Sequence, residues 1–208
     1  ERPVSTRRTL LASLPILLAG VAALAAATDG FRAFTSETAR HLSIVAQARP
    51  LPSVALQTAE GQTVSLAQLR GRWLLVDFIY TRCEIYCSVQ GNEFARLQQR
   101  LAGPISAGQV TLLSISFDPG HDGPRQLQAY QRRSGDRGTG WVAARPLQAA
   151  DLALLLRTFG VVVVPDRLGG YVHNAAIAIV DPRGRLVRIV DWDAHEEAEA
   201  WVRQRIAS

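Results

Sequence analysis

The residues Trp73–Tyr80, WLLVDFIY, form a near-continuous apolar run in the first half of the chain. A run of this kind predicts a central β-strand that is buried on both faces, because a strand with one solvated face would alternate apolar and polar residues. Such a strand requires a sheet covered by helices on both sides. The chain is therefore expected to fold as an α/β protein around this strand.

The order of the other predicted elements agrees with this class. A β-hairpin is expected in Ser53–Leu66 and a second buried strand in Val110–Asp118. The spacing of apolar residues predicts helices at 84–101, 124–133, 151–160 and 194–207, and a second hairpin is expected around Pro182-Arg183-Gly184. Strands that alternate with helices and end in an antiparallel hairpin indicate a mixed sheet flanked by helices, the thioredoxin-like pattern.

The N-terminal segment predicts export from the cytoplasm. Thr9–Ala27 contains no charge over 19 residues and follows Arg2, Arg7 and Arg8. A helix needs roughly 17–25 apolar residues to span a bilayer, and the arginines should remain on the cytoplasmic side. We expect a single-pass anchor in the inner (cytoplasmic) membrane, with the domain on the periplasmic or extracytoplasmic side. Two alternatives are cleavage at the Ala-rich end of the run, as in a signal peptide, and a buried core helix.

These boundaries divide the chain into three predicted parts. Residues 1–28 are expected to form a cytoplasmic stub and the transmembrane helix, and residues 29–50 a stalk. The globular domain is expected to cover residues 51–208, because Pro50 and Pro52 mark a boundary before it.

The composition excludes several classes of function. The net charge is +5, but the arginines are spread along the chain without a basic stripe of interleaved aromatic residues, so nucleic-acid binding is not expected. The excess positive charge suits anionic lipid or an acidic protein partner better. The chain has two cysteines and no methionine, which excludes a disulfide-stapled scaffold and a Met-rich metal tract.

The two cysteines, Cys83 and Cys87, follow the predicted central strand and begin the next predicted helix. A helix N-terminus stabilises a thiolate, which is both the nucleophilic and the metal-binding form of cysteine. Positions i and i+4 of a helix lie about 5–6 Å apart at Cβ, which is wide for a relaxed disulfide at about 3.5–4.5 Å. This spacing suits two sulfurs that meet on one metal ion. Two thiolates favour Cu(I), with Zn(II) as the competitor.

A third ligand is expected to be a histidine from another segment. His173 lies where a glycine-containing loop enters an apolar strand, and a strand end could present its side chain to the helix start. His121 follows the neighbouring strand, and His41 and His195 lie in the stalk and near the last helix. These three are better interpreted as surface residues, so His173 is the predicted ligand.

Three motifs in this order resemble the Sco/SenC family of cytochrome c oxidase assembly proteins. They are DFIYTRCEIYC, SISFDPGHDGPRQLQAY and GYVHNAAIAIVDPRGRL, and the resemblance covers roughly Leu51–Val190. It implies a thioredoxin-like fold and one copper ion held by Cys83, Cys87 and His173. Asp118 matches the aspartate of the family's Asp-Pro and is expected to orient the ligands. The chain departs from the family pattern at Glu84 and Ser88, where family members usually carry prolines.

The resemblance implies a metallochaperone, and not in the first place an enzyme. Copper would pass to the copper-accepting subunit of a respiratory oxidase or to another periplasmic copper protein. The alternative is a thiol–disulfide oxidoreductase, with Cys83 as nucleophile and Cys87 as resolving partner, that reduces the oxidase cysteines. A redox or copper sensor and a purely structural disulfide are weaker hypotheses.

Overall fold

The computed structural model describes residues 6–82, 86–167 and 169–207, with the side chains of residues 6–12 and 86–90 left out of the description. The chain divides into two compact units, Glu1–Ser43 and Ile44–Ser208. The first contains α1 (Thr6–Ala27) and the beginning of α2 (Ser36–Ala46). The expected membrane-spanning helix is not confirmed, since none of the helices in the described ranges reaches the length and apolar character that a bilayer requires.

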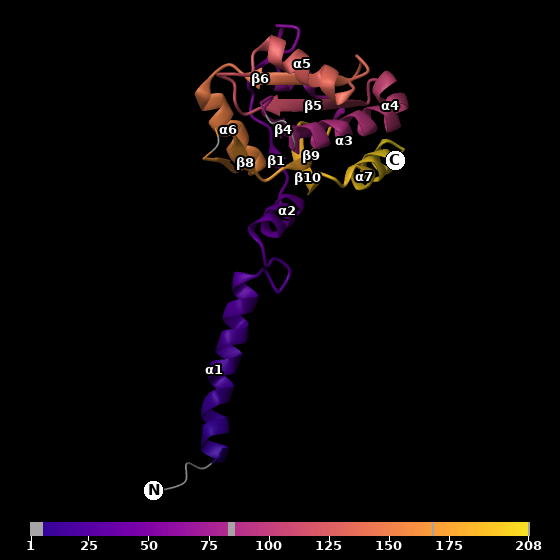
Figure 1. The fold of residues 1–208 in the computed structure, drawn as a ribbon. Coiled ribbons are helices and arrows are strands. Elements are labelled where there is room, and N and C mark those ends of the chain that lie inside the picture. Colours follow the sequence, from indigo (N-terminus) through magenta and orange to yellow (C-terminus); the bar gives the residue numbers. More distant parts are fainter. Residues whose placement is uncertain (1–5, 83–85, 168, 208) are drawn as a thin grey trace. The chain divides into compact units, whose positions relative to one another are not determined.

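The second unit is built on an eight-stranded mixed sheet with the strand order β1-β10-β9-β4-β5-β6-β2-β3 (Figure 1). Its elements, listed in chain order, are β1 (Arg49–Pro50), β2 (Ala55–Thr58), β3 (Thr63–Ser65), the 3-10 helix η1 (Leu66–Leu69), β4 (Trp73–Ile79), α3 (Tyr86–Arg100), α4 (Ala102–Ser106), β5 (Val110–Ser116), α5 (Pro124–Ser134), β6 (Trp141–Pro146), α6 (Ala149–Phe159), β7 (Val163–Pro165), β8 (Tyr171–His173), β9 (Ala176–Val180), β10 (Arg185–Asp191) and α7 (His195–Ile206).

The predicted mixed sheet flanked by helices is confirmed. β4, β5 and β6 are parallel neighbours, while β9 pairs antiparallel with both β4 and β10. Residues 74–79 of β4 are all buried, as its apolar run predicts. Both predicted hairpins form, as β2–β3 and β9–β10.

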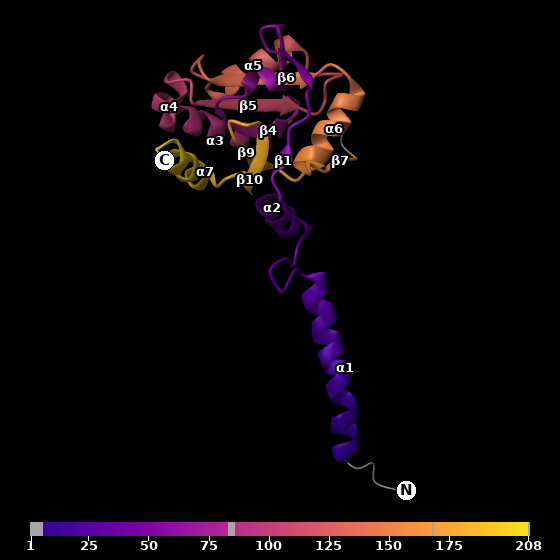
Figure 2. The same ribbon diagram turned by 180° about the vertical axis from the view of Figure 1, so that it is seen from behind.

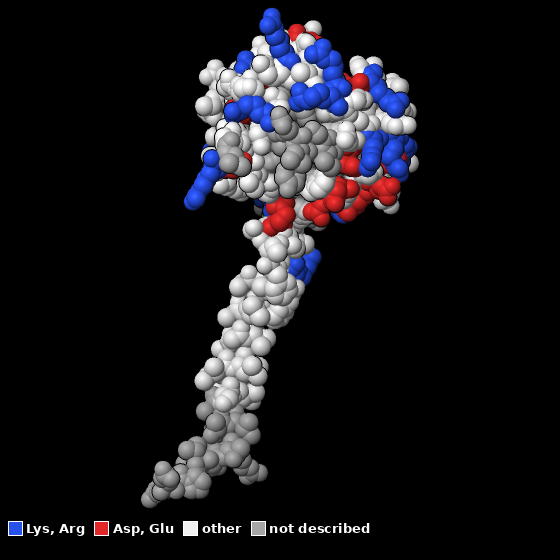
Figure 3. Space-filling view, in the orientation of Figure 1, with Lys and Arg blue, Asp and Glu red and all other residues white. Residues whose placement is uncertain are grey.

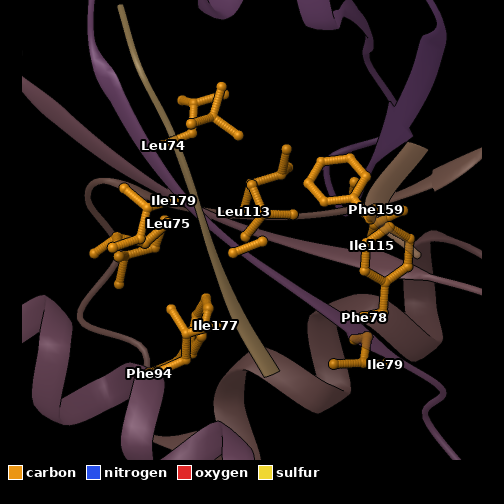
Figure 4. Close-up of a cluster of buried hydrophobic side chains, with 14 of the residues drawn as sticks. Leu74, Leu75, Phe78, Ile79, Phe94, Leu113, Ile115, Phe159, Ile177 and Ile179 are labelled. Carbon is orange, nitrogen blue, oxygen red and sulfur yellow. The ribbon is translucent and has the colours of Figure 1, made fainter. Parts of the chain in front are cut away.

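The two faces of the sheet carry different helices. Phe78 of β4 packs edge-on against Phe159 of α6, with 5.1 Å between the ring centroids (Figure 4). On the opposite face, Trp141 of β6 contacts Phe94 of α3 and Tyr130 of α5. Helix α3 approaches α5 closely at Gly91, where a Cβ atom would collide with the side chain of Ser134.

Three elements differ from the sequence prediction. β6 was not predicted, because its sequence, WVAARP, includes an arginine and ends in proline. α4 continues the helical chain past the predicted stop at Gly103-Pro104. His173 was expected at the start of a strand of the main sheet, but it ends β8, which pairs with β7 in a separate two-stranded sheet.

A carboxyl group is buried inside the central strand. Asp77 is fully buried, and neither carboxyl oxygen has a hydrogen-bond partner of normal geometry in the described part of the chain. Burial raises the pKa of Asp77 from its ordinary 3.8 to about 7, and the neighbouring Ser114 hydroxyl offsets part of this rise. The Ser114 oxygen accepts a hydrogen bond from the Trp141 indole at 2.9 Å.

Because of this carboxyl group, we expect the free energy of unfolding to fall as the pH rises. The folded protein keeps the Asp77 proton up to about pH 7, whereas the unfolded chain loses it near 3.8. Below about pH 4 the raised pKa therefore adds its full contribution, up to about 4 kcal/mol, to the free energy of unfolding. This contribution is lost as the pH rises through 7. Denaturant unfolding of the wild-type chain and of Asp77→Asn between pH 5 and 8 should show the variant increasingly more stable toward pH 8. The same substitution at exposed Asp191 is the control, and a pH-independent difference between wild type and Asp77→Asn would contradict the prediction.

Candidate metal centre

The carboxyl end of β4 is where the predicted ligand segments approach one another. β4 leads through Tyr80, Thr81 and Arg82 toward Cys83, and α3 begins at Tyr86. Cys83 lies outside the described residues. Cys87 falls in the first turn of α3, as predicted, but its side chain is not described. The described backbone therefore reaches this site from one side at Arg82 and from the other at Tyr86.

His173 comes to the same end of β4 from far along the chain. Its Nε2 atom lies 3.1 Å from the carbonyl oxygen of Phe78, five residues before Cys83. Because a carbonyl oxygen can only accept, we assign the imidazole hydrogen to Nε2. In this tautomer Nδ1 carries no hydrogen, so Nδ1 is the atom whose lone pair can bind a metal ion. A ligand histidine that donates its other N–H to a backbone carbonyl is a recurrent arrangement in metal sites.

The electrostatic surroundings also favour a neutral imidazole at His173. Burial lowers the pKa of His173, and the hydrogen bond to the Phe78 carbonyl opposes this effect. A neutral imidazole is the form that binds a metal ion. One such nitrogen and two thiols are a soft donor set of the kind that suits copper, so the residues present fit the ion that the sequence predicts.

An aromatic cluster holds the hairpin that carries His173. The rings of Tyr80, Phe117 and Tyr171 contact one another with centroid distances of 5.2 to 5.6 Å. The His173 ring lies against Phe117 at 5.0 Å. The Tyr80 hydroxyl also donates to the carbonyl of Tyr171 and accepts from its N–H, both at 3.3 Å. Tyr80 thus fixes the β8 backbone two residues before His173.

Asn174 ties the other end of the hairpin to α6. Its side chain donates to the carbonyl of Gly160 at 3.1 Å and accepts from the N–H of Val162 at 2.7 Å. Figures 1 and 2 show α6 beside the β7–β8 hairpin from both sides. His173 is therefore held through Tyr171 and Asn174, which lie on either side of it in the chain, and through its own ring.

The remaining predicted site residue, Asp118, contacts the segment before Cys83. Its Oδ2 atom accepts from the guanidinium of Arg82 at 2.6 Å, and its side chain is 13% exposed. No hydrogen bond or ion pair joins Asp118 to His173 in the described part of the chain. If Asp118 acts on the predicted ligands, it does so through Arg82.

The other three histidines each have a carboxylate partner. His121 lies 3.0 Å from Asp122, His41 lies 3.1 Å from Glu37, and His195 pairs with Glu93. Asp118, His121 and Asp122 are close enough together to surround a cation. However, Asp118 is paired with Arg82 and Asp122 already accepts several hydrogen bonds, so their oxygens are occupied.

The sequence reasoning missed the residues that position the site. Thr81, Ser116 and Asp122 form a buried hydrogen-bonded group next to the cysteine segment. Asp122 is part of the loop after β5, and its position four residues after Asp118 gave no local signal of burial. Tyr80 and Phe117 follow the ends of β4 and β5 in the sequence. Aromatic residues at the carboxyl ends of neighbouring parallel strands could have indicated that this edge of the sheet forms a site.

We expect the two hydrogen bonds of the Tyr80 hydroxyl to stabilise the β7–β8 hairpin measurably. Tyr80→Phe removes both hydrogen bonds to Tyr171, each worth about 1 kcal/mol or less. Amide hydrogen exchange in β7 and β8 should become about fivefold faster per kcal/mol lost, while exchange in β4 and β5 stays unchanged. Tyr171→Phe is the matched control, because the Tyr171 hydroxyl makes no hydrogen bond in the described part of the chain. If amide exchange were accelerated equally in both variants, the Tyr80 hydroxyl would have no specific role in stabilising the hairpin.

Comparisons with known proteins agree on one family. The chain matches the family model described as SCO1/SenC over residues 50–207. It is 27% identical over 134 residues to the SCO1 protein homolog of Bacillus subtilis, covering 64% of this chain and 68% of that protein.

Solved structures show the same fold. A SCO1/SenC family lipoprotein from Bacillus anthracis superposes with a TM-score of 0.69 at 19% identity, covering 78% of this chain and 98% of the other. ScoI of Bradyrhizobium japonicum, solved with copper bound, gives a TM-score of 0.61 at 25% identity, covering 74% and 97%. The mixed sheet and its helices are thus the thioredoxin-like fold of these proteins.

Proposed function

This chain belongs to the SCO1/SenC family, and from that premise we propose that it binds one copper ion through Cys83, Cys87 and His173 and passes it to an acceptor protein. Copper is cargo here and not a permanent cofactor. The observation that carries the proposal is the hydrogen bond from His173 Nε2 to the Phe78 carbonyl. It places a neutral imidazole, with Nδ1 available, beside the strand end that leads into Cys83.

The cysteines would supply the two thiolate ligands. Cys87 lies in the first turn of α3, where the exposed N–H groups and the helix dipole favour a thiolate. Cys83 follows Arg82, whose positive charge is partly neutralised by Asp118. Transfer would proceed by exchange of these ligands for cysteines of the acceptor. The copper site of a respiratory oxidase is the acceptor that we propose, with another periplasmic copper protein as the alternative.

The charge distribution supports an acceptor with an acidic surface. Figure 3 shows arginine side chains over α5 and acidic side chains near α7. α5 carries exposed Arg125, Arg132 and Arg133 and no acidic residue. The Arg133 guanidinium donates to the carbonyl of Thr81, so this basic surface reaches the segment before Cys83. Complementary charge mainly accelerates encounter and selects the partner.

We also propose that α1 anchors the protein to the membrane, with the copper-binding unit on the periplasmic side. The support is the uncharged segment Thr9–Ala27 behind three arginines. Within the described part of α1, apolar side chains are exposed on all sides, and the most exposed are Ile16, Leu17 and Leu18. A helix that is apolar around its whole circumference needs an apolar environment.

Removing His173 should sharply weaken copper binding. Anaerobic titration of the reduced chain with Cu(I), in competition with a chelator, should show one tightly bound ion. Because partners outside the ligand set already change metal affinity by about 10–100-fold, His173→Ala should lower the affinity by on the order of 100-fold or more.

His41→Ala is the matched control for that titration. It removes a histidine of α2 that pairs with Glu37, and it should leave the affinity within a few-fold of wild type. Cys87→Ser should lose tight binding as well. Wild-type affinity in His173→Ala would remove the histidine from the site and favour the thiol–disulfide oxidoreductase, in which His173 has no required role.

The anchor predicts that the full chain stays with membranes after alkaline carbonate extraction. Leu17→Arg places a charge near the middle of the apolar run, which costs about 2.5–3.5 kcal/mol in a membrane helix, and should release part of the protein. Phe34→Arg adds the same charge outside the run, and this variant should remain in the membrane fraction. Extraction of the wild-type chain would disprove an integral anchor.

A further inference from the structure

We propose that Asp122 is a positioning residue for the copper site, because its buried carboxylate fixes the backbone that leads into Cys83. This inference rests on the proposed copper-binding function and adds a residue to it. The family resemblance drew attention to Asp118 in this loop. In the structure, the buried hydrogen bonds of this loop instead converge on Asp122.

Four donors converge on the Asp122 carboxylate, which is fully buried. Oδ2 accepts from the N–H of Thr81 at 2.9 Å and from the Ser116 hydroxyl at 2.6 Å. Oδ1 accepts from the Thr81 hydroxyl at 2.6 Å and lies 3.0 Å from Nδ1 of His121. A buried carboxylate is stable only when its oxygens are satisfied in this way. Two of the four donors come from the single residue Thr81.

The chain around Thr81 is held at further points. Its carbonyl accepts from Arg133 of α5 at 3.2 Å. The next residue, Arg82, pairs with Asp118, and the N–H of Asp118 in turn donates to the Ser116 hydroxyl at 3.1 Å. Both polar backbone groups of Thr81 thus have side-chain partners. Cys83 is only two residues further along the chain, so a fixed Thr81 limits the backbone conformations that lead into it.

The sheet itself does not need this group of hydrogen bonds. β4 and β5 are already joined by a parallel ladder from Trp73 to Ile79, and the N–H of Phe117 donates to the carbonyl of Ile79 at 2.9 Å. The contacts of Asp122 begin beyond that last ladder bond. What they add is a defined path for the three residues between the end of the ladder, at Ile79, and Cys83.

Asparagine is a poor replacement for this carboxylate. Its amide offers one acceptor oxygen and one NH₂ group that donates, and it carries no charge. If the NH₂ group takes the place of Oδ2, the N–H of Thr81 loses its acceptor. If it takes the place of Oδ1, the Thr81 hydroxyl must turn to accept, and the N–H of Thr81 bonds to a neutral oxygen, which gives a hydrogen bond about half as strong as one to a charged group. Either arrangement loosens the path to Cys83.

The test compares two buried aspartates in the full-length reduced chain. Asp181 is also buried, and its carboxylate holds a turn through the N–H groups of Arg183 and Arg185. That turn follows Val180, which pairs with Leu74 at the opposite end of β4. Asp181→Asn makes the same exchange of a buried carboxylate for an amide, and ends the ion pair between Asp181 and Arg185, far from the cysteines.

Asp122→Asn should lower Cu(I) affinity by about 10–100-fold and should shift the thiolate-to-copper charge-transfer bands of the Cu(II) form. Asp181→Asn should lower the unfolding temperature of the apo protein but leave both readouts at wild-type values. Thr81→Val removes only the hydroxyl contact and should fall between Asp122→Asn and wild type, which keeps the inference testable if Asp122→Asn does not fold.

Wild-type affinity and spectra in Asp122→Asn would overturn the inference, as would equal losses in Asp181→Asn. Failure of the proposed function is distinguishable, because the wild-type chain would then bind no copper. In that case we would measure, in the same variants, the rate at which the Cys83 thiol reacts with an aromatic disulfide reagent. A rate that changes in Asp122→Asn and not in Asp181→Asn supports the positioning role, and equal rates in both variants overturn it.

Discussion

The pairing of β4 with β5 on one side and β9 on the other is the interaction on which the rest of the structure depends. It buries both faces of β4, so that its apolar side chains stabilise the packing of α6 on one face and of α3 on the other. The same pairing also fixes where β4 ends. Phe78 offers its carbonyl to His173, Tyr80 its hydroxyl to β8, and Thr81 its backbone to Asp122.

Two buried carboxyl groups near this strand show how differently a protein can accommodate the same chemical group. Asp77 lies within the ladder, has no hydrogen-bond partner of normal geometry among the described residues, and has a pKa raised to about 7. Asp122 lies just beyond the ladder and is surrounded by donors. The first is tolerated within the core, largely as the protonated acid below pH 7. The second organises the polar chain that follows the strand.

Much of the fold could be predicted from the sequence, because β4, β5 and the long helices have strong local patterns. β6 could not, since its arginine and proline conceal a strand that is defined by its parallel partner β5. Local patterns also placed Cys87 at a helix start, as α3 shows, and singled out His173 among four histidines as a ligand, which stays a prediction. They could not reveal Asp122 or the role of Tyr80, whose hydrogen bonds to Tyr171 join residues 91 positions apart. Contacts of that kind exist only once the chain has folded.

The separate two-stranded sheet that carries His173 has a consequence for the order of folding and of the proposed copper binding. His173 and the Phe78 carbonyl that orients it are 95 positions apart in the chain. A partly synthesised or unfolded chain has the cysteines but no histidine beside them, so it offers copper an incomplete coordination sphere. In the proposed site, three-ligand binding becomes possible only after the hairpin has docked, and loading with copper thereby reports that folding is complete.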